Sequence, residues 1–272
     1  MNLKAAYAHI LTTLIQKEEA KYLLCGILGI SKEEYLRNVE STLTQRDIEV
    51  LNDAVKRHNL GEPLSKIIGK REFWSLEFKV TKDTLDPRQD TETLIEGVLE
   101  ALPKEHKYRF LELGVGSGCI IISLLHEYTQ SHGVGVDISP LALNVAKGNM
   151  SNHFLEKRLT LIQSSWFENV EGKYDLIISN PPYISTQEIE TLNENVKNYD
   201  PHLALDGGEN GLECYESIAQ NAGDFLNPGG IITLEIGFGQ AQDVIEIFKN
   251  FKLLKIKKDL SHVERVLIFG QA

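Results

Sequence analysis

The stretch from Leu111 to Ile120, LELGVGSGCI, decides the fold of this chain. It joins a short apolar run to three glycines, Gly114, Gly116 and Gly118, and the residues after it have the pattern of a helix. Glycines between a strand and a helix let the backbone turn tightly and let a ligand approach main-chain atoms closely. We therefore expect a ligand-binding loop at the end of a β-strand.

The spacing of these glycines indicates the kind of ligand. The dinucleotide fingerprint is G-x-G-x-x-G, with its third glycine three positions after the second. Cys119 stands at that position, so this loop is G-x-G-x-G. The spacing disfavours NAD and suits a ligand without a pyrophosphate, such as S-adenosylmethionine. The residues expected to bind it are Gly114, Val115, Gly116, Ser117 and Gly118.

An acidic residue follows at the separation that a nucleoside ligand needs. Asp137 ends the next apolar run, GVGVD, nineteen residues after Gly118. A carboxylate there accepts hydrogen bonds from two ribose hydroxyls. The alternative is an ordinary tight turn, with Asp137 capping a helix that begins near Pro140. The occurrence of loop and acid together favours cofactor binding.

Strands and helices alternate along the rest of this region. Helical stretches separate most of the short apolar runs, which are 108–113, 133–137, 159–163, 174–179 and 230–236. This alternation predicts an α/β fold, with a parallel sheet and helices on both faces. The helices are expected near 118–128, 140–152 and 211–226. Two further runs, FKLLKIKKD and VERVLIFG, have only a short link between them, so we expect them to pair antiparallel at one side of the sheet.

The residues before this region have a different pattern. Helical periodicity dominates the first 72 residues, with a capping box at Ser31 and Glu34 and a further N-cap at Thr44. Alternating apolar residues then predict a short hairpin. The expected division is an N-terminal helical substrate-docking domain, a hairpin linker and a catalytic domain, at 1–72, 73–86 and 87–272.

Composition narrows the class of protein. The 42% hydrophobic and 25% charged residues are ordinary globular composition, and no apolar run approaches the roughly 18 residues of a membrane span. Three widely spaced cysteines argue against disulfides and structural zinc and favour a reducing compartment, so we expect a cytoplasmic protein. The N-terminus has the pattern of a mature helix and not of a signal peptide. No histidine pair has zinc-ligand spacing, so no metal is expected.

Charge is unevenly distributed. Residues 1–72 hold 11 basic and 10 acidic side chains, and the remaining 17 basic and 29 acidic side chains give that part a charge of −12. Affinity for a phosphate backbone comes from Lys and Arg that displace counterions. We therefore expect a protein partner and no direct binding of nucleic acid.

A second motif, DLIISNPPYIS, ends another apolar run at Asn180. Ligands bind outside the carboxyl ends of strands in open parallel sheets, so Asn180 is expected to face the crevice of the glycine loop. Pro181 and Pro182 stiffen the turn and lack N–H donors. The Asn180 side-chain oxygen and the Pro181 carbonyl then form two acceptors that grip an NH₂ group, with the Tyr183 ring packed against the planar group that bears it.

This arrangement suits methyl transfer to an amide or aromatic amine. Such a nitrogen is a poor nucleophile because its lone pair is delocalised. Two acceptors orient it and stabilise the positive charge that develops on it. The alternative is a proline-stiffened loop with a capping asparagine, which the upstream glycine loop disfavours.

Together these motifs resemble a known family. LELGVGSG, VDISPLALNVAKGN, SNPPYI, DPHLALDGGENGLECY and LNPGGIITLEIG resemble the HemK-type glutamine methyltransferases, and GEPLSKIIGKREFW with DPRQDTETLIE narrows the likeness to the branch that methylates release factors. The resemblance implies a Rossmann-like methyltransferase domain joined by a β-hairpin to a small helical bundle. It implies N5-methylation of the glutamine in the Gly-Gly-Gln motif of peptide chain release factors, with S-adenosylhomocysteine as product.

The resemblance also implies roles for single residues. Trp166 would lie beside the adenine, and Asn180 would sit between cofactor and substrate, with Asn180, Pro181, Pro182 and Tyr183 holding the target amide. Arg88 and Glu92 match the family's PR…TE stretch, either through a specific contact or as an ion pair that steadies the linker. Ser165 departs from the pattern because the family often has aspartate there.

Three other functions are compatible with the same motifs. The first is glutamine methylation on a ribosomal protein. The second is methylation of an exocyclic amine of a nucleic-acid base, which requires a flipped base and a basic surface. The third is a non-catalytic module, which the intact Asn180–Tyr183 motif disfavours.

Overall fold

The computed structural model describes residues 1–271 and divides into two compact units. The helical unit comprises Met1–Lys70 with Glu194–Tyr199, and the sheet unit comprises Arg71–Asn193 with the residues from Asp200 onward. Each unit has its own hydrophobic core. The docking role expected for the first 72 residues stays a prediction.

The helical unit is built from short amphipathic helices with local stop and start signals. Ser31 Oγ accepts from Glu34 N at 3.0 Å, and Thr44 Oγ1 accepts from Asp47 N at 3.2 Å, so both expected caps are confirmed. Gly29, at φ +65°, ends the second helix. The elements are α1 (Leu3–Thr13), η1 (Lys17–Glu19), α2 (Ala20–Leu28), α3 (Lys32–Arg37), α4 (Gln45–Asn59), α5 (Leu64–Ile68) and α10 (Glu194–Tyr199).

A two-stranded hairpin follows the first five α-helices. Strands β1 (Lys70–Phe73) and β2 (Leu76–Lys79) begin earlier and end earlier than the linker of 73–86 expected from the sequence. The turn residues, Trp74 and Ser75, both have positive φ, at +51° and +58°. Neither is a usual residue for such a turn, and for this reason the sequence did not reveal its position.

The sheet unit contains seven strands in the order β5-β4-β3-β6-β7-β9-β8. Neighbours from β5 to β7 pair parallel, and β9 pairs antiparallel with both β7 and β8, which confirms the expected topology. The strands are β3 (Arg109–Leu113), β4 (His132–Asp137), β5 (Leu159–Gln163), β6 (Tyr174–Ser179), β7 (Leu226–Glu235), β8 (Phe251–Lys258) and β9 (Glu264–Gln271).

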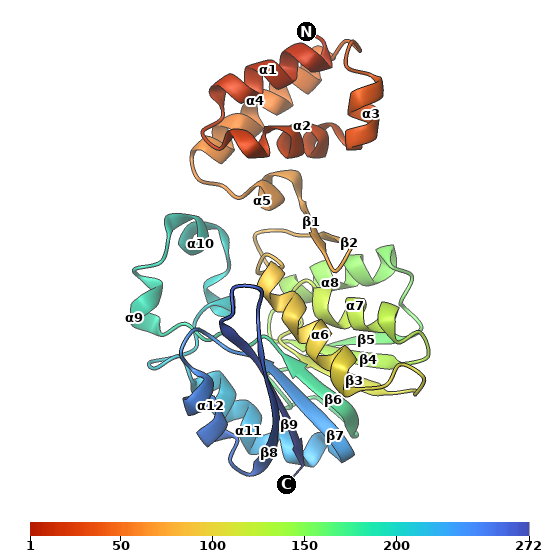
Figure 1. The fold of residues 1–272 in the computed structure, drawn as a ribbon, viewed down its shortest axis with the longest axis vertical. Helices are drawn as coiled ribbons and strands as arrows, with labels where there is room; N and C mark the ends of the chain where they lie inside the picture. The colour runs from red at the N-terminus through yellow and green to blue at the C-terminus, as the bar shows by residue number, and fades with distance from the viewer. Residues whose placement is uncertain (272) are drawn as a thin grey trace. The chain divides into compact units, whose positions relative to one another are not determined.

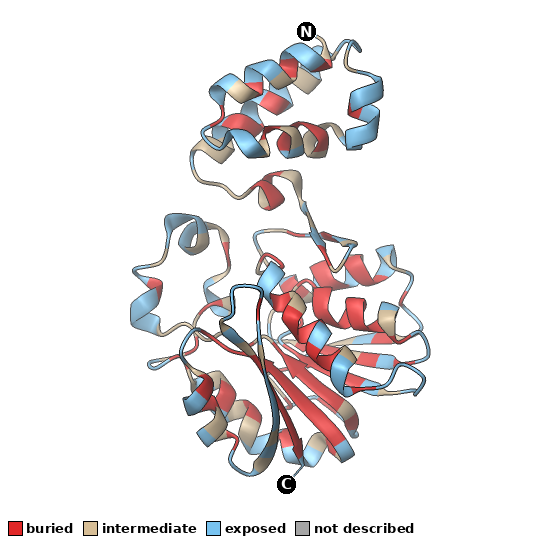
Figure 2. Cartoon of the chain, viewed as in Figure 1, coloured by how far each residue is buried: buried red, intermediate tan, exposed pale blue. Residues whose placement is uncertain are grey.

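Helices cover both faces of this sheet, as Figure 1 shows. One face carries α6 (Glu92–Ala101), α7 (Cys119–Glu127) and α8 (Pro140–Asn152), and the other carries α11 (Glu213–Phe225) and α12 (Ala241–Ile247). Successive strand residues point to opposite faces. On β3, Phe110 belongs to one core and Leu111 to the other. The central strands are accordingly buried along most of their length (Figure 2).

Connections around the carboxyl ends of the strands complete the sheet unit. They include η2 (Gln89–Thr91), α9 (Thr186–Ile189) and η3 (His202–Ala204). Ile184, after β6, pairs with Asp206 in an isolated parallel bridge. Among residues 1–271, no helix combines the length and apolar character needed to cross a membrane.

Candidate active site

A cavity of about 320 Å³ opens at the carboxyl ends of β3, β4 and β6. Its volume is in the range of small-molecule sites. The predicted site residues that line it are Gly114, Val115, Gly116, Ser117, Asp137, Trp166, Asn180 and Pro182. The predicted residues outside its lining are Gly118, Pro181 and Tyr183. The glycine loop and the turn after β6 therefore share one crevice.

The glycine loop has a backbone that glycine alone adopts without strain. Its three glycines, Gly114, Gly116 and Gly118, have φ of +71°, +52° and +81°. That region costs other residues about 1–2 kcal/mol. A Cβ at Gly114 or Gly116 would meet no atom within 4 Å, so the backbone there is open to the cavity. Val115 N donates to Val136 O at 2.8 Å, which ties the loop to β4.

Asp137 connects this loop to the start of the next helix. Its Oδ2 accepts from Gly116 N at 2.9 Å, and its Oδ1 accepts from Ser139 N at 2.9 Å. The N-cap of α8 is Ser139, whose Oγ accepts from Ala142 N at 3.2 Å, so Asp137 does not cap that helix. Burial raises the pKa of Asp137, and the backbone hydrogen bonds partly offset this. Each carboxylate oxygen has a second lone pair for a ligand hydroxyl.

The cavity has an acidic lining. Glu112, at the end of β3, is fully buried and accepts from Ile121 N at 2.9 Å. Burial raises its pKa well above the usual range, and the Asp137 charge adds to the shift. Four further acidic residues line the cavity, together with the cation of Arg88: Asp83, Asp86, Asp137 and Asp206. An acidic cavity with an open glycine loop fits a cationic nucleoside such as S-adenosylmethionine.

Trp166 is held by a tight turn after β5. Its φ of +47° is unusual for a bulky residue, which indicates that the turn is imposed by its surroundings. The buried Ser164 side chain donates to Trp166 O at 3.0 Å and accepts from Asn169 N at 3.0 Å. Ser165 lines the cavity beside Trp166, so a hydroxyl occupies the place where relatives were expected to carry a carboxylate.

Asn180 stands directly beyond β6 and is half-buried. Ser179 Oγ donates to Leu113 O at 2.7 Å, which holds the ends of β6 and β3 side by side. The Asn180 amide nitrogen, Nδ2, donates to Thr91 Oγ1 at 3.3 Å. The amide is thereby anchored through its donor end, so its acceptor end remains for another group.

The turn itself is supported from behind by the loop 206–211. A Cβ on Gly207 would lie 2.9 Å from Pro182 O, so only glycine permits this approach. Gln240 Nε2 donates to Tyr183 O at 2.9 Å and to Gly211 O at 3.3 Å. The Tyr183 ring packs into the core, where burial raises the pKa of Tyr183 to about 12. Its expected contact with substrate stays a prediction.

Arg88 and Glu92 have structural partners. Arg88 pairs with Asp200 at 2.7 Å, and the Asp200 side chain is only 3% exposed. Glu92 Oε1 accepts from Trp74 N at 2.8 Å, which anchors the hairpin turn to α6. Arg88 thus pairs with a residue outside the expected linker and Glu92 with the hairpin turn, so the two roles considered for this stretch stay predictions.

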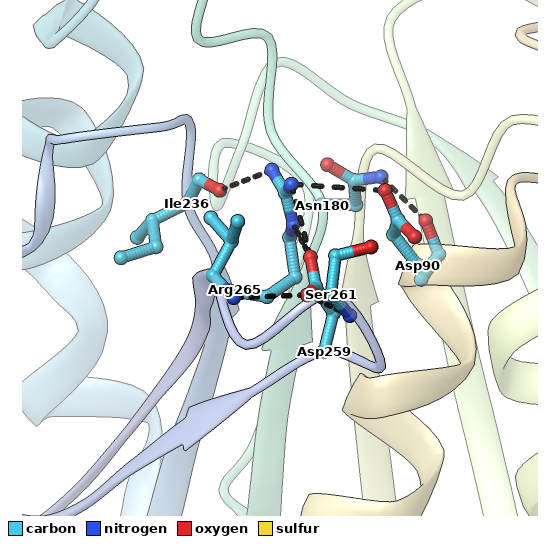
Figure 3. Close-up of polar contacts among 8 residues, drawn as sticks. Asp90, Asn180, Ile236, Asp259, Ser261 and Arg265 are labelled. Carbon is cyan, nitrogen blue, oxygen red and sulfur yellow. Dashed lines mark hydrogen bonds and ion pairs between the residues drawn. The ribbon is translucent and has the colours of Figure 1, made fainter.

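Two functional candidates escaped the sequence analysis, Thr91 and Glu235. Both carry side chains that interact with Asn180, and Glu235 is 2% exposed. Arg265 on β9 donates to Ile236 O at 3.2 Å and its guanidinium lies 3.6 Å from Asp90 Oδ2. Asn180 lies beside this pair in Figure 3. A charged residue inside the apolar run GIITLEI was the available signal for Glu235.

Comparisons with known protein families match both parts of the chain. The model described as "Methyltransferase small domain" matches residues 88–210. The model described as "PrmC N-terminal domain" matches residues 9–69. Within residues 1–271, no cluster of three or more His, Cys, Asp or Glu side chains is arranged to hold a metal ion.

Individual proteins are similar over nearly the whole chain. A release factor glutamine methyltransferase of Agrobacterium fabrum is 41% identical, covering 92% of this chain and 89% of that protein. A release factor glutamine methyltransferase of Caulobacter vibrioides is 37% identical, covering 92% of this chain and 88% of that protein. Among solved structures, the human Mettl16 catalytic domain in complex with the MAT2A 3′UTR hairpin 6 superimposes with a TM-score of 0.59 at 16% identity, covering 80% of this chain and 82% of that one. The last likeness concerns the fold alone.

Proposed function

We propose, since the chain belongs to the family of release factor glutamine methyltransferases, that it transfers a methyl group from S-adenosylmethionine to N5 of a glutamine in peptide chain release factors. The target is the glutamine of their Gly-Gly-Gln motif. The observation that carries the proposal is the placement of Asn180, beyond a central strand and on the wall of an acidic cavity that also holds the glycine loop.

Residues on one side of the cavity bind the cofactor. The open backbone of Gly114–Gly118 approaches it closely, the Asp137 carboxylate accepts hydrogen bonds from its ribose hydroxyls, and Trp166 packs beside its base. The bound cofactor supplies a methyl group made electrophilic by a positively charged sulfur. The acidic lining supports the binding of such a cation.

Residues of the turn after β6 bind and orient the substrate amide. Asn180 Oδ1 and the Pro181 carbonyl accept hydrogen bonds from the glutamine NH₂, and Tyr183 contributes to the packing of the turn. Accepting these hydrogens orients the nitrogen and stabilises the positive charge that develops on it. Pro181 and Pro182 keep the turn rigid, and Gln240 supports it from behind, so the acceptors require little reorganisation.

The charge distribution supports a protein substrate over a nucleic acid. Residues beyond 72 carry a charge of −12, and a nucleic-acid strand would need a basic surface to hold it. Glutamine methylation on a ribosomal protein uses the same chemistry. The experiment must therefore distinguish a ribosomal protein from a release factor as the substrate.

A labelling experiment tests the proposal. Purified protein and methyl-labelled S-adenosylmethionine are incubated in parallel with an intact release factor, with ribosomal proteins and with RNA or DNA. We expect label in the release factor alone, and none with Asn180→Ala. Label in a ribosomal protein or a nucleic acid, with none in the release factor, would reject the proposed substrate.

A further inference from the structure

Thr91 occupies a position that usually has a different role. It ends η2 and directly precedes α6, with helical φ and ψ of −66° and −21°, whereas a capping threonine usually has an extended backbone. Here the Thr91 side chain makes no capping hydrogen bond. Its Oγ1 instead accepts from Asn180 Nδ2 at 3.3 Å, across a sequence separation of 89 residues. The hydroxyl therefore serves the active-site amide and not the helix.

Glu235 is the second residue that lies close to the Asn180 side chain. It is the last residue of β7, and its predecessor Leu234 is in register with Ser179 of β6, so Glu235 and Asn180 are neighbours at the strand ends. Its carboxyl is buried and close enough to the Thr91 and Asn180 side chains for both to favour its ionised form, although the one hydrogen bond that the described residues show among these three side chains is that between Asn180 and Thr91. Within the described residues, Glu235 Oε2 is buried and has no hydrogen-bond partner.

The Thr91 hydrogen bond and the nearby Glu235 carboxyl favour one orientation of the Asn180 amide. An asparagine side chain has a donor end and an acceptor end of nearly equal shape. A carboxylate is an acceptor only, so it attracts the NH₂ end of Asn180 and the hydroxyl hydrogen of Thr91. The Thr91 oxygen is then left to accept the other Asn180 hydrogen. The reversed amide would place two acceptors against each other.

We propose that Glu235 and Thr91 are positioning residues that hold the Asn180 amide with its NH₂ toward the sheet and its Oδ1 toward the cavity. The proposal rests on the proposed function, because the outward Oδ1 is the atom assigned to the substrate amide. Neither residue is assigned contact with the reacting atoms. Both act through the orientation of Asn180.

The protonation state of Glu235 makes the orientation of the Asn180 amide depend on pH. Burial raises the pKa of Glu235 to about 7, although Thr91, Arg265 and Asn180 favour its ionised form. Above that pH the carboxylate accepts, and below it the protonated carboxyl also donates and competes for Asn180 Oδ1. The other ionisable groups that act on it are Asp90 of η2, Cys119 of α7, Tyr183 of the turn, Tyr215 of α11 and Arg265 of β9. Burial raises the pKa of Cys119, Tyr183 and Tyr215, so these three stay neutral near pH 7.

A spectroscopic experiment tests the orientation without substrate. The protein is labelled with ¹⁵N-asparagine, and the Asn180 NH₂ signal is assigned by its loss in Asn180→Asp. We expect both hydrogens of this group to shift between about pH 5 and 9, with a midpoint near the pKa of Glu235. In Glu235→Gln the shift disappears. A wild-type signal that does not titrate, or that titrates equally in Glu235→Gln, overturns the inference.

Kinetics of Thr91 variants provide an independent test should Glu235→Gln fail to fold. Thr91→Val keeps the shape and removes the hydroxyl, and we expect kcat to fall by about 10²-fold with a smaller change in KM. Thr91→Ser restores the hydroxyl and is expected to recover most of the rate. Equal rates in the two variants contradict the inference. Absence of methyl transfer by the wild-type protein, together with a titrating Asn180 signal, would reject the proposed substrate and leave the positioning role standing.

Discussion

The two walls of the cavity are built in different ways. The glycine loop after β3 depends on its own backbone, because Gly114, Gly116 and Gly118 supply the left-handed conformations within five residues. The turn after β6 depends on side chains from distant elements, with Thr91 of η2 anchoring Asn180 and Gln240 supporting Tyr183. The conformation of the glycine loop is thus encoded locally, whereas the turn after β6 is held by residues that are distant in sequence.

Removing the central acceptor of the turn is expected to have the largest effect. Asn180→Ala deletes the oxygen assigned to the substrate amide, and we expect kcat to fall by about 10³-fold. Cofactor affinity is expected to change much less, because the glycine loop and Asp137 remain. Steady-state kinetics and calorimetry measure the two quantities separately. A kcat within about tenfold of the wild type would remove Asn180 from the mechanism.

The acidic residue of the other wall is expected to affect binding more than rate. Asp137→Asn preserves shape and removes charge from hydrogen bonds worth about 1.5–3 kcal/mol, so we expect the cofactor Kd to rise by about 10–100-fold. Saturating cofactor is expected to restore most of kcat. An unchanged Kd in calorimetry would mean that Asp137 serves only the backbone of Gly116 and Ser139.

A matched pair of glycine variants separates backbone strain from ligand contact. Gly116→Ala and Gly229→Ala both place a Cβ at positive φ, +52° and +78°, where no atom lies within 4 Å. Both are expected to lose about 1–2 kcal/mol of unfolding free energy. The cofactor Kd is expected to rise about tenfold in Gly116→Ala alone, since Gly116 lines the cavity. Equal binding by both variants would show that the loop backbone does not approach the ligand.

The smallest effect on kcat is expected from a change at Gln240, which supports the turn after β6. Gln240→Ala removes hydrogen bonds to the Tyr183 and Gly211 carbonyls, and the loss of about 1 kcal/mol predicts a fall in kcat of about fivefold. The control is Gln45→Ala, because among the described residues the Gln45 side chain bonds only to that of Glu49, on the exposed surface of α4. If both variants keep the wild-type rate, the turn does not need this support.

The sequence revealed the features that depend on neighbouring residues. The G-x-G-x-G loop predicted a tight turn that a ligand can approach closely. The alternation of strands and helices, with only a short link between the last two runs, predicted a mostly parallel sheet with an antiparallel end. Thr91 and Glu235 were missed for physical reasons. A threonine at a helix start is expected to be an N-cap, and a glutamate at the end of a strand shows its partners only after β6 and β7 are known to pair. The Trp74–Ser75 turn was missed because neither residue usually adopts positive φ.

The most direct test of the account is the site of methylation on a release factor. The protein is incubated with S-adenosylmethionine and either an intact release factor or the same factor with asparagine in place of the Gly-Gly-Gln glutamine. The peptide containing the motif is then analysed by mass spectrometry. We predict one methyl group on the glutamine side chain of the unaltered factor and none on the altered one. A methyl group elsewhere in the factor, or equal labelling of both factors, would contradict the account.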